Sequence, residues 1–506
     1  MKTSTLKRIT ALFYIIFFIG IVRTEAQNIE DYLKQDAIKY GLTTEDISDW
    51  VITDNYTDQK EGIKHVYFRQ RYQGIEVNIA NGSVHIMPGG ELLTSNNQFI
   101  KNLNQKITGG ATPALTAKEA IEHVANQLNY VIKTPLTVLT VKGGTEQSTV
   151  YSKGGISLEN IPIKLVYTPI NDNQIVLAWE LSIYEIGGQN WWNIRVNATN
   201  GEIIDKNNWM LTCNYNSPHE SNDSPASQAE SSFHRSSVPE LSELNKDNNL
   251  DNLLIGGYNV FPMPVESPNY GIRVLVLNPD NATASPFGWH DTNGIAGPEF
   301  TITRGNNVYA YDDVNDDDLP GFSPDGLAAL TFDFPLNLTY SIGDNSQPAI
   351  ISNLFYWNNI IHDVVYQYGF DEMGGNFQQN NYGKGGVGSD YVNAEAQDGS
   401  GTCNANFGTP PDGSKPRMQM YVCNMNGFFR DGDIDNGVIV HEYSHGTSNR
   451  LTGGPSNVNC LNNSEQMGEG WSDWYALMLT MRAGDAGTNV RPIGTWLFGQ
   501  GPAGPG

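Results

Sequence analysis

Two histidines and three carboxylates in the last quarter of the chain have the types and spacing of a metal-dependent hydrolytic site. The pattern is His441-Glu442-x-x-His445, followed by Glu469 and Asp473. Histidines at i and i+4 lie on one face of a helix, so both imidazoles can reach the same ion. Histidine nitrogens are natural Zn²⁺ ligands, and three protein ligands with an open fourth position define a catalytic zinc site.

The spacing gives these five side chains different tasks. His441, His445 and Glu469 form the ligand set, and Glu442 projects beside them as a general base. Zinc lowers the pKa of its water to around 7, so Glu442 can take that proton and later deliver it to a leaving amine. Asp473 is a natural acceptor for the free N–H of a zinc-bound histidine. The alternative is a structural histidine pair, with Glu469 and Asp473 as solvated surface carboxylates.

Helical periodicity predicts the elements that must hold these side chains. A zinc helix is expected at residues 434–444. A second helix is expected at residues 467–483, which presents Glu469 and Asp473 at i and i+4 on one face. A third helix, at residues 353–369, has an apolar side and is predicted to be amphipathic.

The chain up to about residue 213 has the pattern of small α+β modules. Between residues 50 and 100, alternating apolar residues predict short strands, with a turn at Gln73-Gly74 and a strong hairpin signal at Asn81-Gly82. A Thr116/Glu119 capping box precedes an apolar helical face. Further strands are expected at residues 163–168, 174–184 and 191–196. Helices over antiparallel sheet predict an α+β fold class.

Two other segments have compositions that differ from this pattern. Residues 214–254 are rich in Ser, Asn, Asp, Glu and Pro, which predicts an exposed linker with a maturation cleavage site. Residues 1–26 combine basic residues, an apolar run and small residues near Ala26, as a signal peptide does. A membrane anchor is the alternative, but the run is shorter than the roughly 20 residues of a spanning helix. A secreted, extracellular protein is expected.

Length and charge limit the functional classes. The chain has 506 residues, which predicts two to four domains. Its 30 basic and 55 acidic residues give a net charge of −25. Nucleic-acid binding requires basic patches that neutralise phosphates, so nucleic acid is excluded as a partner.

Four cysteines are permitted to form disulfides in an exported chain: Cys213, Cys403, Cys423 and Cys460. A pair among the last three leaves one thiol unpaired, and the sequence does not choose the pair. Cys213 either is simply buried or ligates the zinc from the precursor region and silences it.

Five aspartates between residues 312 and 318 form the most acidic segment of the chain. Such oxygen-rich loops suit Ca²⁺, although this one matches no EF-hand register. A calcium site and a solvated acidic loop are both open.

Residues 441–476, which read HEYSHGTSNRLTGG and then MGEGWSDWYA at their two ends, resemble the fungalysin family of thermolysin-like zinc endopeptidases. Further blocks similar to this family are residues 258–261, 285–290, 303–307, 404–407 and 409–413. The leader resembles the fungalysin/thermolysin propeptide through VYFRQRYQGIEV, and a PepSY-like segment ends in WWNIRVNATNGEII. The resemblance extends from about residue 45 to residue 506.

The resemblance implies a domain order and an inhibitory leader. Residues 27–112 would form the propeptide, residues 113–213 a PepSY-like module, and residues 255–506 a bilobal peptidase with zinc between its lobes. By analogy His441, His445 and Glu469 bind zinc and Glu442 is the base. Residues 404–407 would lie on or near the edge strand that pairs with the substrate backbone. Family members continue into a helical lobe with an oxyanion-stabilising histidine, so this lobe is expected to be truncated here.

These observations predict a secreted zinc endopeptidase, made as a zymogen, with polypeptide substrates and its own propeptide as an intramolecular inhibitor. A secreted binding or adhesion protein with a structural zinc is the first alternative. A zinc hydrolase that cleaves amide bonds in cell-wall material is the second.

Overall fold

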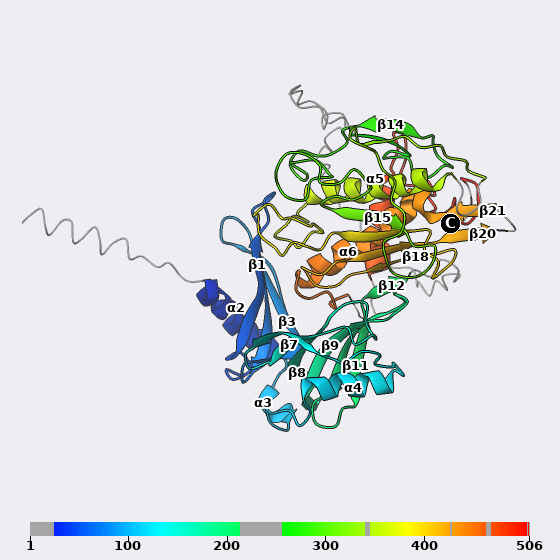
Figure 1. Cartoon of the computed structure of the whole chain (residues 1–506). Helices are drawn as coiled ribbons and strands as arrows, with labels where there is room; N and C mark the ends of the chain where they lie inside the picture. Colours follow the sequence, from blue (N-terminus) through cyan, green and yellow to red (C-terminus); the bar gives the residue numbers. More distant parts are fainter. Residues whose placement is uncertain are drawn as a thin grey trace, which may run out of the picture.

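The computed structural model describes residues 25–212, 256–339, 345–425, 428–461, 467–502 and 504. These residues form an α+β fold in two parts (Figure 1), a leader (residues 25–212) and a C-terminal region (residues 256–504). Cys213 and the segments expected to be a signal peptide and a linker lie almost wholly outside the described residues.

The leader is built on an 11-stranded sheet with the order β1-β2-β3-β8-β9-β10-β11 and four further strands beside it. A parallel bridge between β3 and β8 joins its two halves. The strands are β1 (Trp50–Thr57), β2 (Lys64–Tyr72), β3 (Ile75–Ile86), β4 (Leu92–Asn97), β5 (Ile107–Thr108), β6 (Val138–Gly143), β7 (Ser148–Tyr151), β8 (Ile161–Asn171), β9 (Gln174–Tyr184), β10 (Trp191–Asn197) and β11 (Ile203–Asn208).

The helices of the leader are α2 (Glu25–Tyr40), α3 (Leu103–Lys106) and α4 (Ala117–Gln127). Helices α2 and α4 each bury an apolar face in the leader, whereas the short α3 buries only Leu103. The capping box predicted at the start of α4 is confirmed, because the Thr116 hydroxyl accepts the Glu119 N–H and the Glu119 carboxylate accepts the Thr116 N–H. Ile121 and Val124 are completely buried on the sheet side of α4.

The strands expected at residues 163–168, 174–184 and 191–196 lie within β8, β9 and β10, whereas β6, β7 and β11 were not predicted and one expected turn is wrong. The Gln73-Gly74 turn connects β2 and β3 as predicted, with positive φ at both residues. Asn81-Gly82 makes no hairpin and lies inside β3, with Gly82 opposite Phe68 of β2. A Cβ on Gly82 would lie 2.2 Å from the Phe68 ring, so this glycine permits a close approach inside the sheet.

The C-terminal region contains a five-stranded sheet with the order β12-β18-β19-β17-β15. Its first strand, β12 (Met210–Thr212), comes from the end of the leader. The other strands are β15 (Val308–Asp312), β17 (Val392–Ala396), β18 (Ala405–Gly408) and β19 (Arg417–Met420). A three-stranded sheet comprises β13 (Gly257–Val260), β14 (Val274–Leu277) and β16 (Thr331–Phe332), and a hairpin comprises β20 (Val422–Met425) and β21 (Phe428–Asp431).

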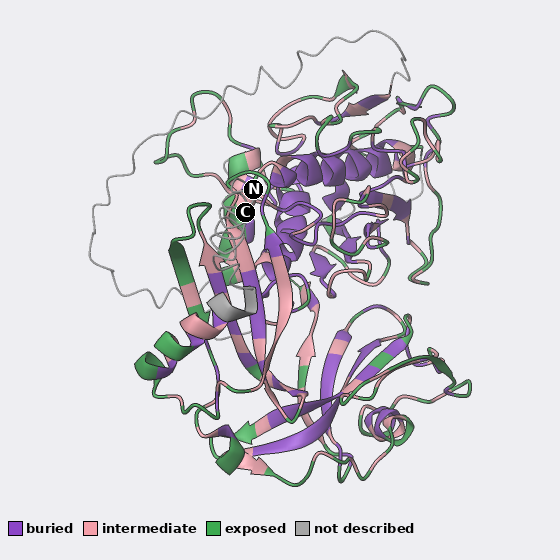
Figure 2. Ribbon diagram, turned by 90° about the vertical axis from the view of Figure 1, so that its left-hand side faces the viewer, coloured by how far each residue is buried: buried purple, intermediate pink, exposed green. Residues whose placement is uncertain are grey.

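Three long helices follow: α5 (Gln347–Tyr366), α6 (Asn436–Gly453) and α7 (Met467–Leu479), with a 3₁₀ turn at Gly432–Ile434. Helices α5 and α6 pack on these sheets, and α7 packs on α6. All three were predicted, with boundaries displaced. The predicted amphipathic character of α5 is wrong, because the helix is buried on nearly every side (Figure 2). It lies between β13, β15, β17 and α6, so no face is left for solvent.

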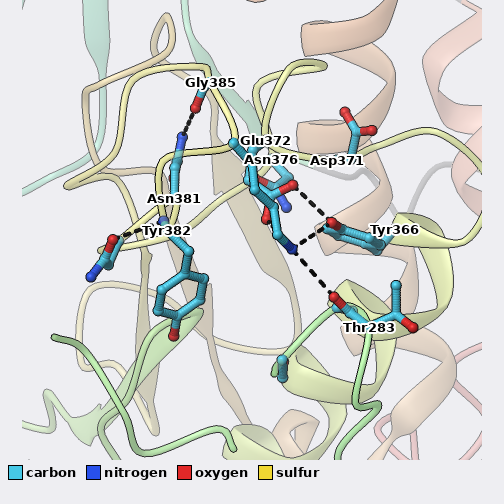
Figure 3. Close-up of polar contacts among 12 residues, drawn as sticks. Thr283, Tyr366, Asp371, Glu372, Asn376, Asn381, Tyr382 and Gly385 are labelled. Atoms are coloured by element: carbon cyan, nitrogen blue, oxygen red, sulfur yellow. Dashed lines mark hydrogen bonds and ion pairs between the residues drawn. The ribbon is translucent and has the colours of Figure 1, made fainter. Parts of the chain in front are cut away.

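Polar contacts hold the glycine-rich segment that follows α5 (Figure 3). Tyr366 donates its hydroxyl proton to Glu372 at 2.9 Å, and Lys384 bonds the Tyr366 hydroxyl at 2.9 Å and Glu372 at 3.1 Å. A Cβ on Gly386 would lie 1.9 Å from the carbonyl oxygen of Glu372, so glycine is required where this loop folds back.

A disulfide between Cys403 and Cys423 ties the segment before β18 to β20, and Cys460 lies outside this bond. The sequence had left this pairing open. The bond anchors the start of β18, the strand to which the leader adds β12.

Candidate metal centre

Helices α6 and α7 pack against each other and bring the predicted ligand residues together. His441 and His445 lie one turn apart on α6, and Glu469 lies in the first turn of α7. The two histidines are buried, whereas 46 % of the Glu469 side chain is exposed. The cluster is therefore enclosed on the α6 side and open on the α7 side.

Three ligand atoms converge in this cluster. The Nε2 atom of His441 lies 3.1 Å from Oε2 of Glu469 and 3.1 Å from Nε2 of His445, and the third distance, from His445 Nε2 to Glu469 Oε2, is 3.6 Å. Bond lengths of about 2.1 Å around a tetrahedral ion put neighbouring ligand atoms about 3.4 Å apart. The residues present therefore fit a zinc ion.

The charges around the histidines favour a cation at this position. Burial alone would lower the pKa of His441, but hydrogen bonds to Asp473 and Glu469 outweigh it and raise the pKa to about 10. Burial, together with the positive charge on His441, lowers the pKa of His445 to about 4. The carboxylates thus favour positive charge at this position, and a bound metal ion would take the place of the proton on His441, because metal binding requires neutral imidazoles.

Each imidazole has a hydrogen-bond partner on α7 at its other nitrogen. Nδ1 of His441 lies 2.9 Å from Oδ1 of Asp473, the residue that the spacing predicted for this contact. Nδ1 of His445 lies 3.2 Å from Oγ of Ser472. Glu442, the candidate base, is completely buried on α6 between the two histidines.

The end of the leader covers this centre. Strand β12 pairs antiparallel with β18, so that Leu211 lies opposite Phe407 and Thr212 lies opposite Asn406. A cavity of about 90 Å³ lies between the two parts of the molecule. Its lining includes Leu211 and Trp209 from the leader, and His445 and Glu469 from the metal centre.

Other hydrogen bonds fasten the leader to the last turn of α6 and to the segment after it. The Tyr67 hydroxyl of β2 donates to the Leu451 carbonyl at 2.9 Å. Trp209 Nε1 donates to the side chain of Asn459 at 2.8 Å, and Ser456 Oγ donates to Asp54 at 2.7 Å. Strands β1 and β2 and the residue between β11 and β12 therefore contact the C-terminal region.

Two parts of the chain match known protein families. Residues 257–504 match the fungalysin metallopeptidase (M36) family, and residues 48–99 match the fungalysin/thermolysin propeptide motif. Extracellular metalloproteinase 1 of Phaeosphaeria nodorum is 30 % identical over 479 residues, which cover 92 % of this chain and 67 % of that protein. The chain belongs to the fungalysin family of metallopeptidases.

Two further fungalysin relatives are similarly close. The extracellular metalloproteinase of Pyrenophora tritici-repentis is 32 % identical over 495 residues (94 % of this chain, 66 % of that protein). The extracellular metalloproteinase mep of Aspergillus fumigatus is 32 % identical over 455 residues (88 % and 63 %). The chain thus spans just under two thirds of the length of these two relatives.

One solved structure, the Bacillus megaterium YpeB C-terminal domain, covers 35 % of this chain and 64 % of that chain at a TM-score of 0.19 and 11 % identity, too low to carry an argument. Within the described part of this fungalysin, no helix combines the length and apolar character needed to cross a membrane.

Sequence reasoning missed two features of this fungalysin site. Ser472 was missed because a serine on a helix is usually a surface residue. Only its position between Glu469 and Asp473 on α7 could have indicated a role at the site. The pairing of β12 with β18 joins segments about 200 residues apart, and no local pattern predicts such a partner.

The acidic segment at residues 312–318 contains both buried and exposed carboxylates, so it is not simply a solvated loop. Asp313 is buried and accepts the N–H groups of Asp317 and Asp318 at 3.1 Å each. Asp318 and Glu395 form ion pairs with the buried Arg417. Arg417 therefore supplies positive charge to the inner carboxylates.

Proposed function

We propose that this protein is a secreted zinc-dependent endopeptidase, made as a zymogen, that hydrolyses peptide bonds in extracellular proteins. The observation that carries the proposal is the convergence of His441 Nε2, His445 Nε2 and Glu469 Oε2 at zinc-compatible spacing. Relatives of similar sequence are named extracellular metalloproteinases. The predicted signal peptide agrees with secretion.

The side chains divide the reaction between binding and proton transfer. When bound, zinc would supply a Lewis acid that polarises the scissile carbonyl and acidifies water. His441, His445 and Glu469 would hold the ion, and Asp473 would orient His441 through its Nδ1–H. Glu442 would take a proton from the attacking water and return it to the leaving amine. Its complete burial strengthens these electrostatic interactions.

Substitution of the base and of a ligand tests these roles separately. We expect Glu442→Gln to lower the rate of casein digestion by a factor of at least about 10², while the protein retains one equivalent of zinc. Glu469→Gln should lose both activity and zinc, because it removes a ligand. Digestion that persists in Glu442→Gln would contradict the assignment of the base.

The main alternative is a secreted binding protein with a structural zinc. Structural zinc sites are closed by four protein ligands. The described residues contribute three ligand-type side chains to this cluster, and the exposure of Glu469 leaves one side open. Zinc X-ray absorption that detects four protein ligands would favour the alternative. Cleavage of peptidoglycan but not casein would favour a cell-wall amide hydrolase.

We also propose that the leader inhibits the enzyme by occupying the substrate position. β18 contains residues 405–407 of the segment expected to pair with substrate, and β12 forms antiparallel bonds along it. Trp209 and Leu211 line the cavity beside His445 and Glu469. An added strand satisfies the exposed backbone groups of a sheet edge, so a substrate strand could not bind there at the same time.

Weakening this strand should release activity before cleavage. The double variant Trp209→Ala/Leu211→Ala, in uncleaved zymogen, should hydrolyse a short peptide substrate at least several-fold faster than the unsubstituted zymogen. Trp192→Ala is the matched control, because Trp192 bonds Glu185 within the leader. Equal activity in all three zymogens would contradict inhibition by β12.

The domain division follows from the same proposal. We assign residues 1–26 to a signal peptide, 27–112 to the propeptide, 113–213 to the PepSY-like module, 214–254 to a linker with the maturation site, and 255–506 to the peptidase.

Helix α7 exposes an apolar stripe along one face, comprising Met467, Trp471, Trp474 and Met478. A helical lobe packed on this stripe would make the peptidase bilobal and place the zinc between the lobes.

Calcium is a second candidate metal. Carboxylate oxygens of Asp313, Asp318 and Glu395 lie within 4.8 Å of one another, and oxygen clusters suit Ca²⁺. A rise in melting temperature with added Ca²⁺ that disappears in Asp318→Asn would support a calcium ion there. No change with Ca²⁺ would mean that Arg417 alone balances the cluster.

A further inference from the structure

Ser472 contacts the second histidine of the centre from the opposite side of its ring. Its Oγ lies 3.2 Å from Nδ1 of His445, while Nε2 of His445 faces the converging ligand atoms. Ser472 is completely buried, although it lies on α7 between the half-exposed Glu469 and Asp473. Gly468, which also lies beside this Nδ1, has no side chain to offer as an acceptor.

We propose that Ser472 is a positioning residue for the zinc ligand His445. The inference rests on the proposed zinc site and adds a residue to it. A neutral imidazole carries one N–H and one lone pair, and the partner of the N–H decides which nitrogen faces the metal. The Ser472 hydroxyl accepts Nδ1–H, which directs the Nε2 lone pair into the cluster and fixes the ring plane.

The two histidines thus have unlike supports. His441 donates to the carboxylate of Asp473 at 2.9 Å, and His445 donates to a hydroxyl at 3.2 Å. A carboxylate partner makes an imidazole a more basic ligand than a hydroxyl partner does. Glu442, Glu469 and Asp473 already surround the centre with three carboxylates. A hydroxyl at residue 472 orients the second ring without adding a fourth negative charge.

The test compares zinc binding in three serine variants of the whole protein. Zinc dissociation constants are measured by competition with a chromophoric chelator, and the melting temperature of each zinc-free protein is recorded. Ser472→Ala should weaken zinc binding by about 10- to 100-fold, and Ser472→Thr, which retains the hydroxyl, should restore most of it. The cobalt(II)-loaded Ser472→Ala protein should also show a shifted visible absorption band.

Ser444→Ala is the matched control. Ser444 is a buried serine next to His445 on α6, but its hydroxyl donates to the Val440 carbonyl at 2.7 Å within the helix. Its removal should leave zinc affinity unchanged. This control separates loss of a buried hydroxyl near the centre from loss of the contact with the imidazole.

The outcomes distinguish the inference from the function on which it rests. If the unsubstituted protein binds zinc and Ser472→Ala binds it equally well, the positioning role is overturned and the zinc site stands. If Ser472→Ala and Ser472→Thr are weakened alike, the hydroxyl is not responsible, and the inference is also overturned. If the unsubstituted protein binds no zinc, the proposed function itself fails.

Discussion

Helices α4 and α5 both pack on a sheet, but they are buried in different ways. α4 buries one apolar face and leaves residues such as Lys118 and Glu122 on the surface. α5 is buried on nearly every side, and its buried residues include Asn353, Asn359 and Asp363. The leader helix is thus held mainly by the hydrophobic effect, and the helix of the C-terminal region also by a polar network.

The polar network around α5 explains how the C-terminal region can hold a polar site. Buried polar groups cost free energy unless each finds a partner, so a network fixes the positions of its members more narrowly than apolar packing does. Asn353 of α5 donates to Asn436 at the start of α6, the helix of the metal centre. The network therefore connects directly to the element that must hold its side chains in place.

The largest effect is expected from a break in the network around α5. The Asp363 carboxylate accepts bonds from the Asn281 N–H, the Ser285 hydroxyl and the Trp289 indole. Asp363→Ala leaves these donors buried without an acceptor and should lower the free energy of unfolding by about 3–5 kcal/mol. Glu122→Ala, on the exposed face of α4, should change it by less than about 0.5 kcal/mol. Urea unfolding measures both changes in the free energy of unfolding. Equal changes would contradict the difference between the burial of α4 and that of α5.

A buried carboxyl at the start of α6 should make the C-terminal region sensitive to high pH. Burial, and then the neighbouring Asp435, raise the pKa of Glu266 to about 9, above an unfolded value of about 4.3. Its contribution to stability is complete below pH 4.3 and is lost as pH rises towards 9. Glu266→Gln stays neutral, so its melting temperature relative to the unsubstituted protein should rise between pH 5 and 9. A constant difference would contradict the raised pKa.

The leader contains a carboxylate with the opposite behaviour. Burial would raise the pKa of Glu76, but Arg69 and Lys164 outweigh it and lower the pKa to about 2. Its contribution is present above about pH 4.3 and is lost as pH falls towards 2. Glu76→Gln should therefore melt at a lower temperature than the unsubstituted protein at pH 7, with a difference that shrinks below pH 4.3. A difference that grows in acid would reverse the assignment.

The smallest effect is expected at the start of α4. Thr116→Ala removes the hydroxyl that caps the helix and should cost about 1 kcal/mol of stability, seen in urea unfolding. Thr116→Ser retains the cap and serves as the control. A loss above about 3 kcal/mol would mean that α4 depends on more than its cap and its apolar face.

The sequence predicted the leader better than the C-terminal region, because apolar faces follow local patterns and polar networks do not. Alternation and capping are local signals, and they located β2, β9 and α4. The turn predicted at Asn81-Gly82 is wrong, because Gly82 instead leaves room for the Phe68 ring within the sheet. The burial of α5 on all sides was not predictable, because the partners of its polar residues come from distant loops.

The two halves of the candidate metal centre were predictable because helical spacing controls each of them. His441 and His445 share a face by period, and Glu469 and Asp473 share another. The contact between Ser472 and His445 depends on how α6 and α7 cross, and the cover provided by β12 depends on pairing across the whole chain. No local sequence pattern predicts the contact between Ser472 and His445 or the pairing of β12 with β18.

Anomalous X-ray scattering at the zinc edge from crystals of the secreted protein would show whether His441, His445 and Glu469 hold a zinc ion. We predict one zinc peak within about 2.2 Å of Nε2 of His441, Nε2 of His445 and a carboxylate oxygen of Glu469, with no fourth protein ligand. A map without a peak between these three side chains, or a zinc ion closed by four protein ligands, would contradict a catalytic zinc at this position.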